Sequence, residues 1–331
     1  MAVNKDNIQL PVLTRIFNCA KDNIRPALST IRFLLLIMLP VSFAILLLRC
    51  TGLLHYISKF MNPLMQFVGL PGEAALAYLS AIFMNIYSAI AVIKTLVLTD
   101  KQLIILGTMC MIAHNFFVEC LVTKKTGSRL RKIVLLRIFA SFLAAWILRY
   151  ILPPGINFLK IREPLAATVP KLGFNTEEFL NGLRPWFIDS IFLILQIFLI
   201  VFAVMFLHRL LAEFGFIQKL GKTARPFMGF MGLSPNTAYV WIVANTAGLA
   251  YGAGVILEEV SAGNLSRTDA DIFNHNASIS HSQIEDTALF VSLGVPYLWA
   301  SLPRFLLSII VVWAERLRRA IFRSSFRVKV V

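Results

Sequence analysis

Charged residues are scarce in this sequence. They make up 15% of its 331 residues, whereas a typical soluble domain has about 25%. Hydrophobic residues reach 58%, and several apolar runs approach the ~20 residues with which a helix crosses a bilayer. Alternating apolar segments of ~10 residues, which mark a membrane β-barrel, are missing. This composition excludes a soluble domain and predicts an all-α polytopic membrane protein.

Cysteine and catalytic motifs are scarce as well. The sequence has no Cys-x-x-Cys pair, and its four cysteines are too few for a disulfide scaffold. No nucleophile elbow, zinc-protease motif or dinucleotide fingerprint is present. We therefore expect neither an enzyme nor a resident cofactor. The four cysteines are Cys19, Cys50, Cys110 and Cys120.

Acidic residues are few relative to basic ones, and the formal net charge is +15. Most of the basic residues lie at the ends of apolar runs, where cytoplasmic loops carry Lys and Arg. We therefore expect membrane lipid, and not nucleic acid, to be the partner of this charge. The basic, amphipathic C-terminal stretch suits anionic cytoplasmic lipid.

Eight apolar segments and two shorter ones divide the chain. The shorter pair, 53–68 and 216–231, predicts interfacial helices. A Pro- and Gly-rich stretch separates two halves. The eight apolar segments lie near 28–50, 73–98, 102–122, 131–152, 187–212, 235–260, 268–293 and 295–321.

The domain organisation that follows has five parts. It comprises an N-terminal amphipathic cytoplasmic segment (1–27), a first repeat (28–152), a linker (153–184), a second repeat (185–322) and a basic tail (323–331). No cleavable signal peptide is evident at the start, so we expect the first span to be retained.

The two halves resemble each other in sequence. "PLMQFVGL" at 63–70 matches "PFMGFMGL" at 226–233, an offset of 163. After a four-residue insertion, "IAHNFFVE" at 112–119 matches "ISHSQIED" at 279–286. Chance similarity of membrane-biased composition is the weaker explanation, because Pro, Gly, His and acidic residues match in order. The sequence therefore predicts an internal repeat.

Basic residues indicate the orientation of the loops. Residues 1–32 hold five basic and two acidic residues. Segment 124–132 holds five basic and no acidic residues, and segment 315–331 holds six basic residues and one acidic residue. Segment 258–271 holds four acidic residues and one basic residue, and the linker is near balance. The positive-inside rule places the three basic segments in the cytoplasm. By the same charge count, segment 258–271 and the linker are predicted to lie outside.

Eight full crossings conflict with that orientation. The conflict disappears if 102–122 and 268–293 each enter and leave on the same side. Each half then has three crossings plus one re-entrant or broken helical element and an interfacial helix. An odd number of crossings inverts the second half relative to the first, a recurring transporter architecture. A crossing by 102–122 remains the alternative, because 21 residues are enough to span.

The polar stretch "NHNASISHSQIEDT" (274–287) stands out in this apolar chain. An ionisable residue at bilayer depth costs at least ~2.5–3.5 kcal/mol, so this stretch should face protein, water or a ligand. An external loop, or histidines merely bonded to backbone carbonyls, are the structural alternatives. The candidate binding residues from both repeats are His114, Asn115, Glu119, Asn276, His281, Ser282, Gln283 and Glu285.

Two further patterns accompany these residues. A mixed set of donors could hold a divalent metal ion instead; it consists of Cys110, His114, Glu119, His281, Glu285 and Asp286. A second polar surface is predicted around Asn245, Thr246 and Tyr251, where small residues also suit close helix packing. Its counterparts in the first half are Asn85, Tyr87 and Ser88.

These motifs together resemble a known family. Two copies of a module with "P-x-M-x-F-x-G-L", a Gly/Ala-rich helix and a His-bearing polar segment are similar to the nucleoside-recognition, or Gate, domain. This module occurs in spore maturation membrane proteins, in the membrane part of ferrous iron transporter B and in concentrative nucleoside transporters. The resemblance covers about 28–152 and 184–322.

The resemblance implies an inner-membrane protein with transport or substrate-recognition character. In the nucleoside carriers, polar residues on hairpins and broken helices hold base and ribose. The positions here that could do likewise are Asn115, Glu119, Ser282, Gln283 and Glu285. The chain has no GTPase domain and is shorter than a full nucleoside carrier, so the family does not fix the cargo.

We expect a secondary transporter for a small polar solute, and the family resemblance favours a nucleoside-like solute. Both termini are expected in the cytoplasm. A divalent-metal permease is the second hypothesis. The third is a non-transporting membrane subunit in envelope or spore assembly. A homo-oligomer and a partner membrane subunit are both open, because the sequence does not give the oligomeric state.

Overall fold

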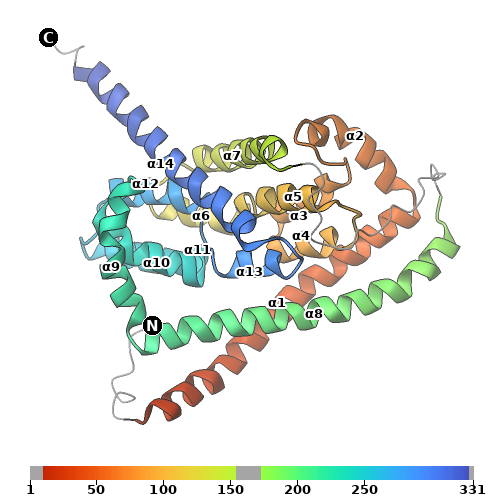
Figure 1. The fold of residues 1–331 in the computed structure, drawn as a ribbon, viewed down its shortest axis with the longest axis horizontal. Coiled ribbons are helices and arrows are strands. Elements are labelled where there is room, and N and C mark those ends of the chain that lie inside the picture. The colour runs from red at the N-terminus through yellow and green to blue at the C-terminus, as the bar shows by residue number, and fades with distance from the viewer. Residues whose placement is uncertain (1–9, 154–172, 328–331) are drawn as a thin grey trace.

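The computed structural model describes residues 10–153 and 173–327, and within these ranges it contains helices and no strand (Figure 1). The all-helical prediction is therefore confirmed for the described chain. The helices of the first half are α1 (Val12–Cys50), α2 (Leu53–Phe67), α3 (Ala74–Phe83), α4 (Ile86–Ile93), α5 (Asp100–Ile112), α6 (Phe116–Lys125) and α7 (Leu130–Ile151). Those of the second half are α8 (Thr176–Glu213), α9 (Phe216–Phe230), the 3-10 turn η2 (Pro235–Thr237), α10 (Ala238–Ala247), α11 (Leu249–Ser261), α12 (Arg267–Ala277), α13 (Glu285–Val291) and α14 (Tyr297–Arg327).

Among the described residues, four helices are long and apolar enough to cross a membrane, and the number is five if the bent pair α5–α6 is counted as one span. The four are α1, α7, α8 and α14. Helix α1 is a single helix of 39 residues, so residues 12–27 of the predicted N-terminal segment continue directly into the first apolar run. The protein is thus a helical membrane protein with several spans.

The two longest helices, α1 and α8, run antiparallel along one side of the molecule (Figure 1). Arg15 near the start of α1 pairs with Glu213 at the end of α8, at 3.1 Å. Arg49 near the end of α1 pairs with Glu178 near the start of α8, also at 3.1 Å. These contacts fix two ends of the molecule, one at Arg15 and the other at Arg49.

Each half contains a helical hairpin between its first long helix and its last one. Helices α3 and α4 fold back on each other, and so do α10 and α11. Asn85 breaks the first hairpin in extended backbone and caps α4 by accepting from the Ser88 amide. Gly248 breaks the second at φ 84°, which a glycine adopts without steric cost. Both breaks lie at the matching place of the repeat.

The run α5–α6 follows α7 from end to end. Lys101 at the start of α5 donates to the Leu152 carbonyl just past α7, at 2.7 Å. At mid-length, Arg137 of α7 donates to the Ile112 carbonyl at 2.8 Å. The bend between α5 and α6 is 41°, so the pair is a kinked rod and not a hairpin. This bend fits the broken helical element predicted for the first half, and the choice between crossing and re-entry for 102–122 stays a prediction. The helices that fold back on each other are α3 and α4.

The run α12–α13 follows α14 in the same way. Asp271 of α12 pairs with Arg319 near the end of α14. Asp286 of α13 pairs with Arg304 near its start, at 3.1 Å. This run matches the broken helical element predicted for the second half, and its crossing or re-entry also stays a prediction. The helices that fold back on each other are α10 and α11.

The acidic segment 258–271 lies at the same end as the basic loops. Ser128 of the basic loop donates to Asp271 at 2.5 Å, and Arg319 of the basic segment 315–331 pairs with that same carboxylate. The prediction that 258–271 lies on the opposite side was wrong. The positive-inside rule depends on Lys and Arg, and acidic residues contribute little to it. We name this end the basic end.

The repeat recurs in backbone conformation as well as in sequence. Gly52 and Gly215, which precede α2 and α9, have φ of 72° and 67°. Gly69 and Gly232, which follow these helices, have φ of 80° and 72°. Both pairs keep the offset of 163 found in the sequence. Helices α2 and α9 lie at opposite ends of the molecule (Figure 1).

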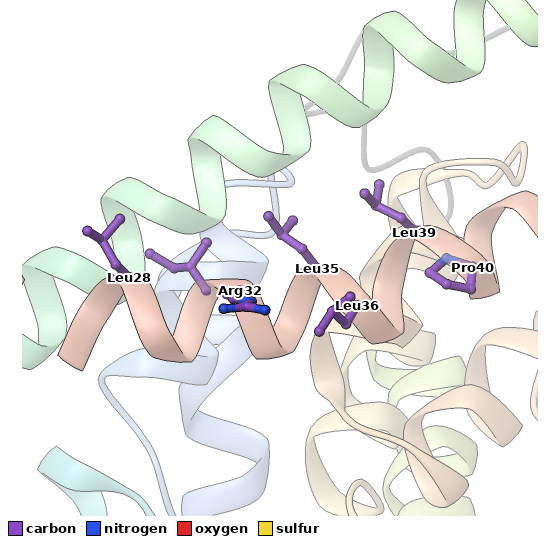
Figure 2. A pocket seen from close by; sticks show the side chains of 7 residues that line it. Leu28, Arg32, Leu35, Leu36, Leu39 and Pro40 are labelled. Atoms are coloured by element: carbon purple, nitrogen blue, oxygen red, sulfur yellow. The ribbon is translucent and has the colours of Figure 1, made fainter. Parts of the chain in front are cut away.

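A shallow apolar groove runs along α1 beside α8. Figure 2 shows Leu28, Leu35 and Leu39 along it, with Arg32 the one charged residue of its lining. Apolar residues on the surface of a spanning helix suit contact with lipid chains. The groove contains none of the polar residues predicted to bind a ligand, so it is not the candidate site.

Candidate functional site

The breaks of the two kinked runs form the centre of the site. Asn115 and Ser282, at these breaks, have φ of 50° and 48°, the only positive values among the described non-glycine residues. The Asn115 amide donates to the Ala81 carbonyl at 2.8 Å, and the Ser282 amide donates to the Ala244 carbonyl at 3.0 Å. Each hairpin therefore holds the break of its own half by the same backbone bond.

The two predicted histidines face each other across these breaks. The ring centroids of His114 and His281 are 5.1 Å apart, and both residues are buried. Nδ1 of His114 lies 3.0 Å from the Met111 carbonyl, and Nδ1 of His281 lies 2.7 Å from the Ala277 carbonyl. Because a carbonyl oxygen only accepts, each Nδ1 must carry the proton. Each Nε2 then points away from its own helix end.

Glu119 joins the two histidines. Its Oε1 lies 3.1 Å from Nε2 of His114 and 3.1 Å from Nε2 of His281. Its Oε2 pairs with Arg137 Nη1 at 2.7 Å. One carboxylate of the first half therefore connects both histidines and a buried arginine.

Asp286, the repeat counterpart of Glu119, pairs with a second buried arginine. Arg304 Nη1 lies 3.1 Å from Asp286 Oδ2, and Arg304 Nη2 donates to Thr287 at 3.0 Å. Asp286 Oδ2 is 4.0 Å from His114 Nε2. The six side chains His114, Glu119, Arg137, His281, Asp286 and Arg304 make up the central cluster.

The hydrogen bonds in the central cluster require added protons. With both Nδ1 atoms committed to carbonyls, a neutral histidine presents only a lone pair at Nε2. Two such lone pairs against an ionised Glu119 oxygen would place acceptor against acceptor. At least one further proton, on a histidine or on Glu119, makes the observed distances favourable. The cluster is thus chemically suited to hold and release protons.

The charge balance disfavours a metal ion there. Nitrogen and oxygen ligand atoms of His114, His281 and Asp286 lie within 4.8 Å of one another, so the donor geometry is suitable. However, Arg137 and Arg304 already neutralise the two carboxylates. A divalent cation would add two uncompensated charges beside two buried guanidinium groups. The predicted metal set is also dispersed, because Cys110 and Glu285 lie outside this group.

The remaining predicted residues surround the central cluster. Asn276 donates to Ser308 at 3.0 Å, while its buried Oδ1 has no hydrogen-bond partner among the described residues. Gln283 accepts from Ser301 at 2.9 Å and from Arg304 at 3.4 Å. Glu285 points elsewhere and accepts a hydrogen bond from Tyr87 of the opposite half. Cys110 is fully buried one turn before His114.

Sequence reasoning missed the two arginines of the central cluster. Arg137 and Arg304 are both 0% exposed, and both lie within predicted spans. They are 167 positions apart, the offset that relates the histidines, and each is followed four residues later by serine, Ser141 and Ser308. A charged residue repeated inside two apolar spans was the available signal, since such residues are usually functional.

The second predicted surface lies on the hairpins. Tyr87 of α4 reaches Glu285 of α13, and Asn245 of α10 accepts the Ile284 amide on its backbone carbonyl. Within the part of the chain that the structure describes, the buried Oδ1 of Asn245 has no hydrogen-bond partner. Ser88 and Thr246 bond locally within their own helices. The side chain of Tyr251 lies outside the described residues.

Comparison with known proteins gives two matches. The family model of the Gate domain, described as nucleoside recognition, matches residues 31–127. The chain is similar to a Bacillus subtilis (strain 168) protein, "Uncharacterized membrane protein YvoD", with 30% identity over 264 residues, which cover 78% of this chain and 82% of that protein. No solved structure matches the chain.

Proposed function

We propose, from the premise that this chain belongs to the nucleoside-recognition (Gate) family of membrane proteins, that it is a secondary transporter for a small polar solute. The central cluster carries this proposal. Ionisable groups at membrane depth are costly, and in transporters they mark substrate paths and proton relays. A scaffold would be stabilised as well by apolar packing at the same place.

Two inverted repeats support this reading. Helices α1 and α7 and the kinked pair α5–α6 provide three crossings in the first half, with α2 interfacial and the hairpin α3–α4 re-entrant. The second half repeats this order with α8 to α14. Three crossings invert the second half, which agrees with the position of α2 and α9 at opposite ends (Figure 1). Broken helices at a repeat interface are a common transporter site.

The solute site would be formed where the hairpin tips meet the breaks of the kinked runs. Asn245 and Asn276 each offer a buried oxygen that lacks a hydrogen-bond partner in the described ranges. Asn115, Ser282 and Gln283 lie at or beside the breaks. Amide and hydroxyl groups bind the hydroxyl and ring-nitrogen groups of nucleoside-like solutes. His114, His281 and Glu119 would couple transport to a proton.

The orientation follows from the basic end. It contains the basic loop 124–132 and the end of α14, so it faces the cytoplasm by the positive-inside rule. Both termini then lie on the cytoplasmic side of a bacterial inner membrane. No enzyme activity, nucleic-acid contact or cofactor is part of this proposal, and a homo-oligomer or a partner membrane subunit remains compatible with it.

A divalent-metal permease is the second candidate, favoured by the donor atoms of His114, His281 and Asp286. It is weaker because of the two neutralising arginines. A non-transporting subunit in envelope or spore assembly is the third. It would retain function after substitution in the central cluster while requiring a partner protein.

Ligand-induced thermal stabilisation tests these readings. Purified protein would be melted with nucleosides, with nucleobases and with divalent metals. A ligand at 100 times its dissociation constant stabilises the folded state by ~2.7 kcal/mol. His281→Ala should abolish the shift, whereas His55→Ala, on α2 outside the central cluster, should retain it. Uptake of the stabilising solute into proteoliposomes then tests transport.

The outcomes separate the candidates. Stabilisation by nucleosides that His281→Ala removes supports the transporter, and stabilisation by metals alone supports the permease. Stabilisation that persists in His281→Ala would place the solute elsewhere. No stabilisation by any class would count against both transport readings.

A further inference from the structure

The two ends of the kinked runs are closed by contacts of opposite chemistry. At the basic end, the end of α6 and the following loop meet α12 and α14 through polar side chains. At the other end, the repeat-related positions of α13, α5 and α7 meet through apolar side chains. The backbone is repeated in the two halves, but the side chains at these equivalent positions differ. The difference between the two ends therefore comes from the residue types and not from the arrangement of the helices.

Ion pairs hold the basic end together. Glu315 of α14 pairs with Lys132 of α7 at 2.6 Å and with Arg319 at 2.7 Å. Arg319 continues to Asp271 of α12, and Asp271 accepts from Ser128 of the loop at 2.5 Å. This chain of contacts crosses from the first half to the second twice.

Asn274 adds a buried hydrogen-bonded centre. Its Nδ2 donates to Thr126 at 2.8 Å, to Ser128 at 2.9 Å and to the Thr123 carbonyl at 3.3 Å. Asn274 is 0% exposed. The residues Ser128, Lys132, Asp271, Asn274, Glu315 and Arg319 together form what we name the polar latch.

At the opposite end, the offset of 167 replaces each of these groups by an apolar one. Asn274 corresponds to Gly107, and Thr123 corresponds to Phe290. Phe290 lies against Gly107 so closely that a Cβ on that glycine would be 2.7 Å from the ring. Asp271, Glu315 and Arg319 correspond to the buried apolar residues Ile104, Leu148 and Leu152, which belong to the same hydrophobic core cluster as Phe290. We name Gly107, Phe290 and these three residues the apolar plug.

We propose that the polar latch and the apolar plug are the two gates of the solute path, and that the latch is the one that opens more readily. This inference rests on the proposed transport function and on the orientation that places the latch in the cytoplasm. The resting state is closed at both ends, with the central cluster buried between them.

The difference in ease of opening follows from solvation. Hydrogen bonds and ion pairs of the latch exchange for bonds to water when the gate opens, so the net loss per bond is ~0.5–1.5 kcal/mol. Opening the plug exposes apolar surface, at ~25 cal/mol per Å², and water forms no compensating bonds there. The latch therefore admits water before the plug does.

Two native cysteines lie where water would enter. Cys120 of α6 is one residue from Glu119, and the Thr123 hydroxyl donates to its carbonyl at 2.9 Å, so it separates the cluster from the latch. Cys110 of α5 lies one turn after Gly107 and one turn before His114, so it separates the cluster from the plug. Both cysteines are free and buried.

The experiment measures how fast each cysteine reacts with a small membrane-impermeant methanethiosulfonate in sealed vesicles of known orientation. Two chains are used, one retaining only Cys120 and the other only Cys110, with alanine at the other three cysteine positions. Glu315→Gln weakens the latch and Phe290→Ala weakens the plug. Glu213→Gln, which breaks the Arg15 ion pair on α1, is the matched control. Melting of each variant confirms that it folds, and Asp271→Asn replaces Glu315→Gln if that variant does not.

Glu315→Gln should raise the labelling rate of Cys120 from the cytoplasmic side about tenfold, a shift of ~1.4 kcal/mol in the opening equilibrium, and leave Cys110 unchanged. Phe290→Ala should raise the labelling rate of Cys110 from the side opposite the cytoplasm and leave the labelling rate of Cys120 unchanged. Equal rises at both cysteines, or none in a folded variant, would overturn the two-gate proposal. Labelling needs no solute, so side-specific labelling without any uptake would refute the transport function alone.

Discussion

Replacing Arg137 by methionine tests whether the central cluster is held by charge compensation. Arg137 is 0% exposed, pairs with Glu119 at 2.7 Å and donates at 2.8 Å to the carbonyls of Ile112 and His114. The substitution keeps most of the side-chain volume and removes every donor. It leaves the two carbonyls at the helix break without these donors and the carboxylate without its cation.

The expected loss of unfolding free energy is ~3–5 kcal/mol, the usual cost of removing one partner from a buried ion pair. Arg131→Met is the control on the same helix, because Arg131 is exposed and surface changes usually stay within ~0.5 kcal/mol. Adding Glu119→Gln to Arg137→Met removes the uncompensated charge. The double variant should therefore recover ~0.5–3 kcal/mol relative to the sum of the two single changes.

Unfolding of the purified protein in mixed micelles with increasing SDS, followed by tryptophan fluorescence, measures these differences. The charge-compensation argument would be refuted if Arg137→Met cost no more than Arg131→Met. It would also fail if Glu119→Gln and Arg137→Met were simply additive, since the two groups would then not depend on each other.

Two further substitutions test contacts between the halves. Tyr87→Phe should lower the unfolding free energy by ~1–3 kcal/mol, because the Glu285 carboxylate loses a donor from the opposite half; an unchanged melting curve would show that this bond contributes nothing. Gly107→Ala should destabilise by ~1–3 kcal/mol, since the new Cβ overlaps the Phe290 ring. Gly254→Ala, with no described atom within 4 Å of the added Cβ, should be neutral or stabilising, and equal losses at both glycines would contradict the packing argument.

Much of the site could be predicted because the two halves share matching residues at a constant offset in the sequence. The offset that aligns His114 with His281 also aligns Glu119 with Asp286, and these four residues meet in the structure. The arginines escaped attention because each is a single charge within a long apolar run. Glu285 was predicted from its spacing to His281, but it faces Tyr87 instead, because the break at Ser282 interrupts the helical register.

The sequence alone determined the membrane class, the two halves and the matching His and acidic residues of the site, because hydropathy, repeat spacing and scarce polar residues are local properties. Only the tertiary structure decided where the chain reverses. Both α3–α4 and α5–α6 are apolar and interrupted, so composition does not distinguish a hairpin from a kinked span. Packing distinguishes them, since α3 and α4 fold back on each other whereas α5–α6 lies along α7.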